Sequence, residues 1–70
     1  MHKTDIRIRK MVCRGFTVEI CIDGAWQRQL SVDVDTYREA RQRAIILCRE
    51  YGVRGFEVTR YVFIPIARQS

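Results

Sequence analysis

The sequence predicts a single small α+β domain in which one helix packs on an antiparallel β-sheet. Three observations predict this fold class. The chain has 70 residues, which is the length of one domain with one core. Several segments alternate apolar and polar residues, as strands do, and one segment has apolar residues at helical spacing. The predicted order is β-β-α-β, with room for an extra strand at either end.

The N-terminal segment gives the weakest strand signal. Residues 1–5 have no apolar periodicity, so we expect a flexible tail. Residues 6–9 alternate isoleucine and arginine, which indicates either a short edge strand or an ordered basic arm. Gly15 ends this segment.

Residues 16–34 predict an antiparallel hairpin. In residues 16–23, one face carries Phe16, Val18, Ile20 and Ile22, and the other carries Thr17, Glu19, Cys21 and Asp23. Asp23 and Gly24 form a dipeptide typical of hairpin turns. Residues 26–34 then predict the second strand, with Leu30, Val32 and Val34 on one face. One face of this hairpin is therefore expected to meet solvent.

The helix is expected to begin at Asp35 or Thr36, where Thr36 and Glu39 fit the capping-box pattern. Gly52 is expected to end it as the residue after the last turn. The stripe that should face the sheet consists of Tyr37, Ala40, Ala44, Leu47, Cys48 and Tyr51.

The segment 56–64 has two interpretations. Its apolar second half favours one strand buried on both faces, whereas a tight turn near residues 59 and 60 would make two short strands. Pro65 ends the pairing or marks a sheet edge, and residues 67–70 are expected to be flexible. One helix cannot cover both faces of the sheet. The apolar residues near Tyr61 and Phe63 therefore need the N-terminal segment, a second copy in a homodimer, or a partner protein as cover.

The net charge of +5 is unevenly distributed. Residues 1–14 carry five cations and one acid, residues 15–37 carry one cation and four acids, and residues 38–70 carry seven arginines and three acids. A chain with both basic and acidic regions suits docking on a protein at least as well as binding to nucleic acid.

No motif for catalysis, a metal or a cofactor is present. The three cysteines, Cys13, Cys21 and Cys48, lack metal-ligand or disulfide spacing, and the only histidine is His2. Cys48 lies on the stripe expected to be buried, and Cys21, expected to be accessible, has no histidine as its base. We expect a cytoplasmic, non-enzymatic protein without catalytic residues, metal or cofactor. We also expect no membrane among its partners, since the sequence shows neither a signal peptide nor a membrane span.

Two groups of residues are candidate binding sites. Aromatic side chains that could meet a partner are Trp26, Tyr61 and Phe63. Cations that could contact phosphates or an acidic surface are Arg7, Arg9 and Lys10 near the N-terminus and Arg38, Arg41 and Arg49 on one flank of the predicted helix.

The layout FTVEICIDGAWQRQLSVDVDTYREARQRAIILCREYG followed by GFEVTRYVFIP resembles the small phage-encoded anti-CRISPR proteins that inhibit type I effector complexes. The resemblance covers about residues 16–66, is one of architecture, and brings no catalytic residues with it. It implies a non-catalytic inhibitor that docks on a protein or ribonucleoprotein complex. Many members are acidic DNA mimics, whereas this basic chain would contact acidic protein patches, guide RNA or target DNA. The alternative hypothesis is a small basic protein that binds DNA or RNA with its arginine-rich helix flank and N-terminal arm.

Overall fold

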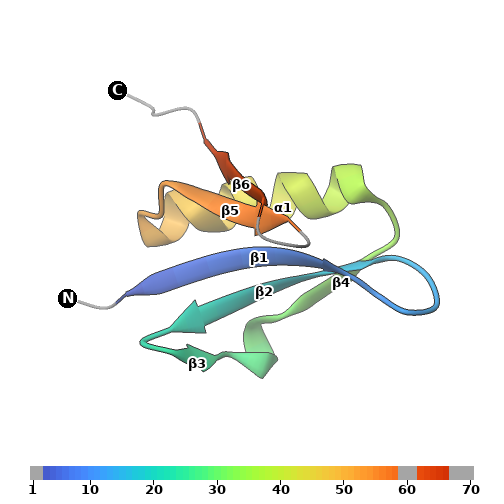
Figure 1. Ribbon diagram of the computed structural model, residues 1–70, viewed down its shortest axis with the longest axis horizontal. Helices are drawn as coiled ribbons and strands as arrows, with labels where there is room; N and C mark the ends of the chain where they lie inside the picture. The colour runs from blue at the N-terminus through green and yellow to red at the C-terminus, as the bar shows by residue number, and fades with distance from the viewer. Residues whose placement is uncertain (1–2, 59–61, 67–70) are drawn as a thin grey trace.

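The computed structural model describes residues 3–58 and 62–66, which form a mixed sheet of six strands with one α-helix on one face (Figure 1). The strands are β1 (Thr4–Lys10), β2 (Phe16–Ile22), β3 (Ala25–Trp26), β4 (Val32–Val34), β5 (Gly55–Val58) and β6 (Val62–Pro65), and the helices are α1 (Tyr37–Tyr51) and a 3-10 turn η1 (Arg28–Leu30). The predicted α+β class is confirmed, but the sheet is mixed rather than antiparallel because β1 and β5 run parallel, and the predicted order matches only roughly.

The N-terminal segment forms a central strand. The sheet order is β3-β2-β1-β5-β6, and β4 also pairs with β2. β1 pairs antiparallel with β2 and parallel with β5, so the interpretation of residues 6–9 as an edge strand or arm is wrong. The physical reason is that Ile6 and Ile8 are buried in the core together with residues of β2, β5 and α1.

The expected tail 1–5 also needs correction, because β1 begins at Thr4. The backbone N–H of Lys3 donates to Asp23 Oδ1 at 2.9 Å, and the N–H of Asp23 donates to the carbonyl oxygen of Lys3 at 2.7 Å. These two hydrogen bonds hold the start of β1 against the turn between β2 and β3.

The predicted second strand of the hairpin, residues 26–34, is interrupted. Both β3 and β4 pair antiparallel with β2, but η1 lies between them. The N–H of Leu30 donates to the carbonyl oxygen of Gln27 at 3.0 Å, which closes a turn that leaves Leu30 exposed. Local hydrogen bonding in this turn replaces sheet pairing over these residues.

The predicted helix is confirmed at both ends. The N–H of Glu39 donates to Thr36 Oγ1 at 3.2 Å, and the Thr36 hydroxyl donates to Glu39 Oε1 at 3.1 Å. At the other end Gly52 adopts a left-handed conformation with φ of 68°, and its N–H donates to the carbonyl oxygen of Cys48.

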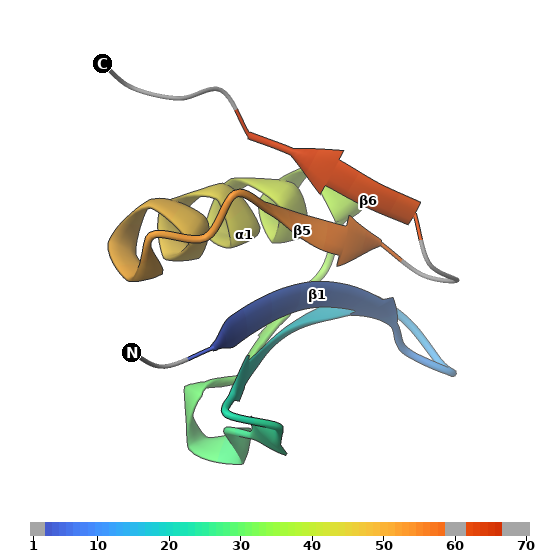
Figure 2. The same cartoon turned by 60° about the vertical axis from the view of Figure 1, so that its left-hand side comes forward.

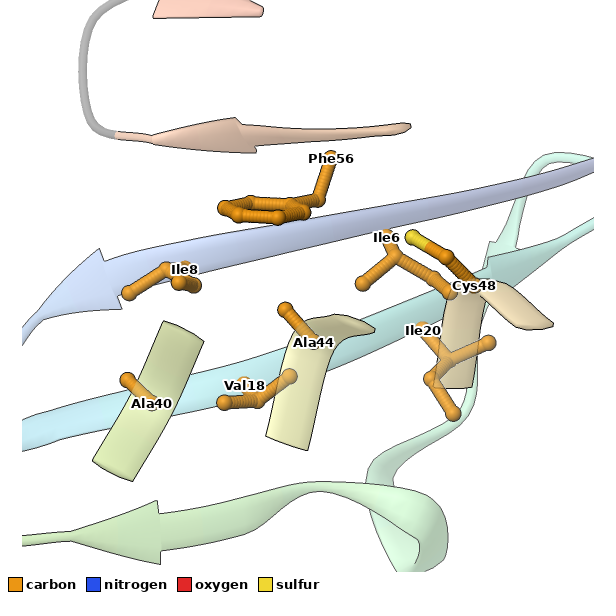
Figure 3. Close-up of a cluster of buried hydrophobic side chains, with 8 residues drawn as sticks. All are labelled: Ile6, Ile8, Val18, Ile20, Ala40, Ala44, Cys48 and Phe56. Carbon is orange, nitrogen blue, oxygen red and sulfur yellow. The ribbon is translucent and has the colours of Figure 1, made fainter. Parts of the chain in front are cut away.

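The core lies between α1 and three adjacent strands, β2, β1 and β5 (Figure 3). From the predicted stripe of α1, Ala40, Ala44 and Cys48 are fully buried, whereas Tyr37 and Tyr51 lie at its exposed margin. Two small alanines let the helix approach the sheet closely. The core consists of Ile6, Ile8, Val18, Ile20, Ala40, Ala44, Cys48 and Phe56.

Of the two interpretations of residues 56–64, the two-strand one is confirmed. β5 and β6 pair antiparallel, with Phe56 opposite Ile64 and Glu57 opposite Phe63. β6 is an edge strand that ends at Pro65, as the proline predicts. The expected turn at residues 59 and 60 and the tail 67–70 lie outside the described residues.

Candidate functional site

The sheet has one face covered by α1 and one face turned away from it (Figure 2). We call the second the open face. Because side chains alternate along a strand, the neighbours of the buried core residues point to it. The open face carries Asp5, Arg7, Arg9, Thr17, Glu19, Cys21, Trp26, Asp33, Glu57 and Phe63. The N-terminal segment does not cover it, contrary to one of our three expectations, because that segment is inside the sheet.

The register aligns four of these residues across the sheet. Glu19 on β2 lies opposite Arg7 on β1, Arg7 is the partner of Glu57 on β5, and Glu57 lies opposite Phe63 on β6. This row therefore runs acid, base, acid, aromatic over four adjacent strands. Sequence spacing could not align these residues, because the row depends on which strands are neighbours.

Arg7 and Arg9 share one carboxylate. Arg7 Nε lies 2.6 Å from Glu19 Oε1, and Arg9 Nη2 lies 3.4 Å from Glu19 Oε2. The Arg7 guanidinium also lies 3.7 Å from the centroid of the Trp26 ring, a cation–π contact. Arg7 is thereby turned toward β2 and β3. Two cations that the sequence offered for phosphate contacts are thus engaged in ion pairs.

Phe63, at the other end of the row, is 54% exposed, and it lies against Gly55. A Cβ atom at Gly55 would lie 2.7 Å from Phe63 Cζ and would also clash with the carbonyl oxygen of Ile64. The aromatic ring of the edge strand β6 thus covers the backbone of this buried glycine on the neighbouring strand β5. Tyr61, the third aromatic candidate, lies outside the described residues.

The edge beside Phe63 is poorly suited to accept another strand. The N–H of Ile66 donates to the carbonyl oxygen of Arg54 at 2.9 Å. Hydrogen-bonded pairs alternate along an antiparallel ladder, so the backbone polar groups of Phe63 and Pro65 point away from β5, toward the free edge of the sheet. Pro65 has no N–H to donate. The face of the sheet, rather than this edge, is the better surface for a partner.

The six candidate cations do not form one surface. Arg7 and Arg9 are on the open face, whereas Arg38, Arg41 and Arg49 are exposed on α1, which lies on the other face. Lys10 is exposed at the end of β1. Among the described residues, no ion pair joins any of the three helix arginines to a carboxylate.

The cysteines have different environments. Burial raises the pKa of the Cys48 thiol from its ordinary 9.0 to about 11, so it is a neutral core side chain at physiological pH. Cys21, expected to be accessible, is only 6% exposed, because β1 and β3 flank it. Cys13 is exposed and free. Within residues 3–58 and 62–66, no cluster of His, Cys, Asp and Glu side chains is arranged to hold a metal ion.

One feature of interest escaped the sequence interpretation. The loop between β1 and β2 carries Met11, Val12 and Cys13, all exposed. The signal was present as three successive apolar residues between Lys10 and Arg14. These three residues follow a segment of alternating residues and have no periodicity of their own.

No known protein family, no curated protein and no solved structure matches this chain significantly. In the part of the chain that the structure describes, no helix has the length and apolar character to cross a membrane.

Proposed function

We propose that this protein is a non-catalytic binding protein that docks on a larger protein or ribonucleoprotein complex through the open face of its sheet. The observation that carries the proposal is the exposure of two large aromatic side chains on a face that α1 leaves uncovered. Trp26 on β3 is 44% exposed, and Phe63 on β6 is 54% exposed. The two rings lie on the strands at the two ends of the sheet order, and aromatic side chains are enriched in protein interfaces.

The charges of the open face favour a protein partner over a nucleic acid. It carries four carboxylates, Asp5, Glu19, Asp33 and Glu57, against the two guanidiniums of Arg7 and Arg9. A phosphate backbone would be repelled by this excess of acids. A protein surface of mixed charge can place a cation beside Glu57 and Phe63, where the row ends.

The specific form of the proposal is inhibition of a type I CRISPR effector complex, which the architectural resemblance implies. An inhibitor of this kind needs only a rigid surface. The test is DNA binding by a purified type I effector complex, with and without the protein, measured by gel shift. We expect the protein to inhibit DNA binding and to co-elute with the complex in size-exclusion chromatography.

Matched variants connect the effect to the open face. Trp26→Ala and Phe63→Ser should each weaken binding at least about tenfold, because buried aromatic side chains dominate interface energies. The control is Ile46→Ala, since Ile46 is also 54% exposed but lies on α1. Equal loss in all three variants, or no complex formation by the wild-type protein with any type I effector, would count against the proposal. Self-association at the same face would appear as a concentration-dependent dimer that the Phe63 variant abolishes.

The alternative function is nucleic-acid binding through α1. The observation that favours it is the exposure of Arg38, Arg41 and Arg49 without ion pairs to carboxylates in the described residues. Affinity for DNA or RNA should then fall steeply with salt, because each phosphate contact releases counterions. Arg38→Glu with Arg41→Glu should abolish binding, whereas Arg7→Gln should leave it unchanged. Affinity for nucleic acid that does not depend on salt, or that is unaltered in the Arg38→Glu, Arg41→Glu variant, would show that α1 is not the binding surface.

A further inference from the structure

The loop between β1 and β2 presents an apolar tip to solvent. Val12 is fully exposed, Met11 is 37% exposed, and Cys13 next to them is exposed as well. In both Figure 1 and Figure 2 this loop projects from the end of the sheet, away from the rest of the chain. Three successive apolar side chains in water are unfavourable unless a partner covers them.

The base of the loop is held in place, so the tip is a defined protrusion. The N–H of Met11 donates to the carbonyl oxygen of Gly15 at 3.1 Å. Gly15 has a φ of 89°, and a Cβ atom there would lie 2.5 Å from the carbonyl oxygen of Val34. Only glycine fits this close approach to β4. Because the base is closed, less conformational entropy of the loop is lost when a partner binds.

The tip lies between cations. Lys10 and Arg14 flank it and are exposed, whereas Arg9 is paired with Glu19 on the open face. No acidic residue occurs between Asp5 and Glu19 in the sequence, although Asp33 and Asp35 lie on and after β4, near the base of the loop. The tip itself is thus apolar, with positive charges beside it.

We propose that this loop docks the protein on an anionic lipid bilayer, with Met11 and Val12 entering the headgroup layer and Lys10 and Arg14 contacting lipid phosphates. Long basic side chains can place their apolar stems among lipids and their charges at the headgroups. Anionic lipids also attract basic segments close to the surface.

A bilayer fits this tip better than a protein cleft. Protein interfaces depend on shape complementarity and on anchors such as tryptophan, tyrosine and arginine, and valine is uncommon among such anchors. A small aliphatic protrusion needs no shaped cavity in a bilayer, because lipids rearrange around it. The proposal is independent of the open face, so either can fail without the other.

The chain carries a suitable reporter. Cys13 is exposed, whereas Cys21 and Cys48 are buried, so a thiol-reactive fluorophore that senses polarity should label Cys13 selectively. The measurement is its emission with phosphatidylcholine vesicles and with vesicles that also contain phosphatidylglycerol. We expect a blue shift with the anionic vesicles alone. Trp26 pairs with Cys21 at the far end of β2, so its emission should not change.

Sedimentation of unlabelled protein with the same vesicles tests which residues carry binding. Val12→Asn should lower the partition coefficient about tenfold, since it removes an inserted aliphatic group without changing the charge. Lys10→Gln with Arg14→Gln should lower it about twentyfold. The matched control, Arg38→Gln with Arg49→Gln, removes the same charge from α1 and should have a much smaller effect. Circular dichroism should show that all three variants remain folded.

Three results would overturn the proposal. Wild-type protein that does not sediment with anionic vesicles would do so directly. Equal losses for the loop and helix double variants, or an unchanged Val12→Asn variant, would show attraction by net charge alone. A Cys13 fluorophore that stays in a polar environment on vesicles, but shifts on a purified protein partner, would assign the tip to a protein cleft instead.

Discussion

On the face of the sheet beneath α1, Ile6 and Ile8 of β1 are 2% and 1% exposed, whereas Arg7 between them points to the open face and pairs with Glu19. The same strand thus contributes apolar burial to one face and charged contacts to the other. Removal of apolar area from water provides most of the stability of a small domain, and exposed ion pairs provide little. The covered face therefore maintains the fold, and the open face can be adapted for binding at small cost in stability.

The largest predicted effect compares two phenylalanines on neighbouring strands and opposite faces. Phe56→Ala, at a residue 1% exposed under α1, should lower the free energy of unfolding by about 3–5 kcal/mol. Phe63→Ala, on the open face, should lower it by about 1 kcal/mol, because its ring is half in water already. Urea denaturation followed by circular dichroism measures both. Similar losses would show that the open face is part of the core.

The next prediction concerns Gly55, where a Cβ atom on β5 would meet β6. Gly55→Ala should destabilise the protein by about 1–3 kcal/mol, because the new methyl group would displace Phe63 and the carbonyl group of Ile64. Thermal unfolding would measure the loss. Combining it with Phe63→Ala should cost less than the sum of the two single changes. Strict additivity would mean that the ring does not lie on the glycine.

A smaller effect is expected for the ion pairs of the open face. Glu19→Gln should cost about 1 kcal/mol, since Glu19 is only 15% exposed but its partners Arg7 and Arg9 are 34% and 60% exposed. The loss should shrink as salt screens the charges. Denaturation at low and high sodium chloride concentrations tests this expectation. A large loss that is unaffected by salt would indicate a buried ion pair rather than a surface one.

The smallest effect on stability at neutral pH is expected from the ionisation of the Cys48 thiol, which is buried under α1. Its pKa of about 11 exceeds the ordinary value of 9.0, so the folded state holds this proton more tightly than the unfolded state. Its contribution to stability is complete below pH 9 and is lost as the pH rises toward 11. Stability measured from pH 8 to 11 should therefore fall more steeply in the wild-type protein than in Cys48→Ala. Parallel pH profiles would contradict the assigned burial.

Local signals predicted α1 and β2 well. Thr36, Glu39 and Gly52 mark the ends of α1 through hydrogen bonds and backbone conformation that depend on adjacent residues alone. Alternation likewise identified β2 and the sharing of faces within it. These features could be predicted because the interacting groups are close together in the sequence.

The candidate site was predicted less completely. Trp26 and Phe63 were identified as exposed aromatic residues, and the structure agrees for both. The alternative hypothesis combined Arg7 of the N-terminal arm with the arginines of the helix flank, but alternation in β1 turns Arg7 away from α1. Helical spacing places residues on a face of α1, but it does not tell which strands lie beside that face.

The sequence by itself determined the capping contact between Thr36 and Glu39, where α1 begins and ends, and which side chains of a strand share a face. Only the tertiary structure decided that β1 lies between β2 and β5, that Glu19, Arg7, Glu57 and Phe63 form a row, and that Cys21 is buried. The physical reason is that alternation assigns the residues of a strand to two faces but does not identify which strands pair with it. Pairing between distant strands depends on burying Ile6, Ile8 and Phe56 together under one helix, a gain in free energy that no single segment contains.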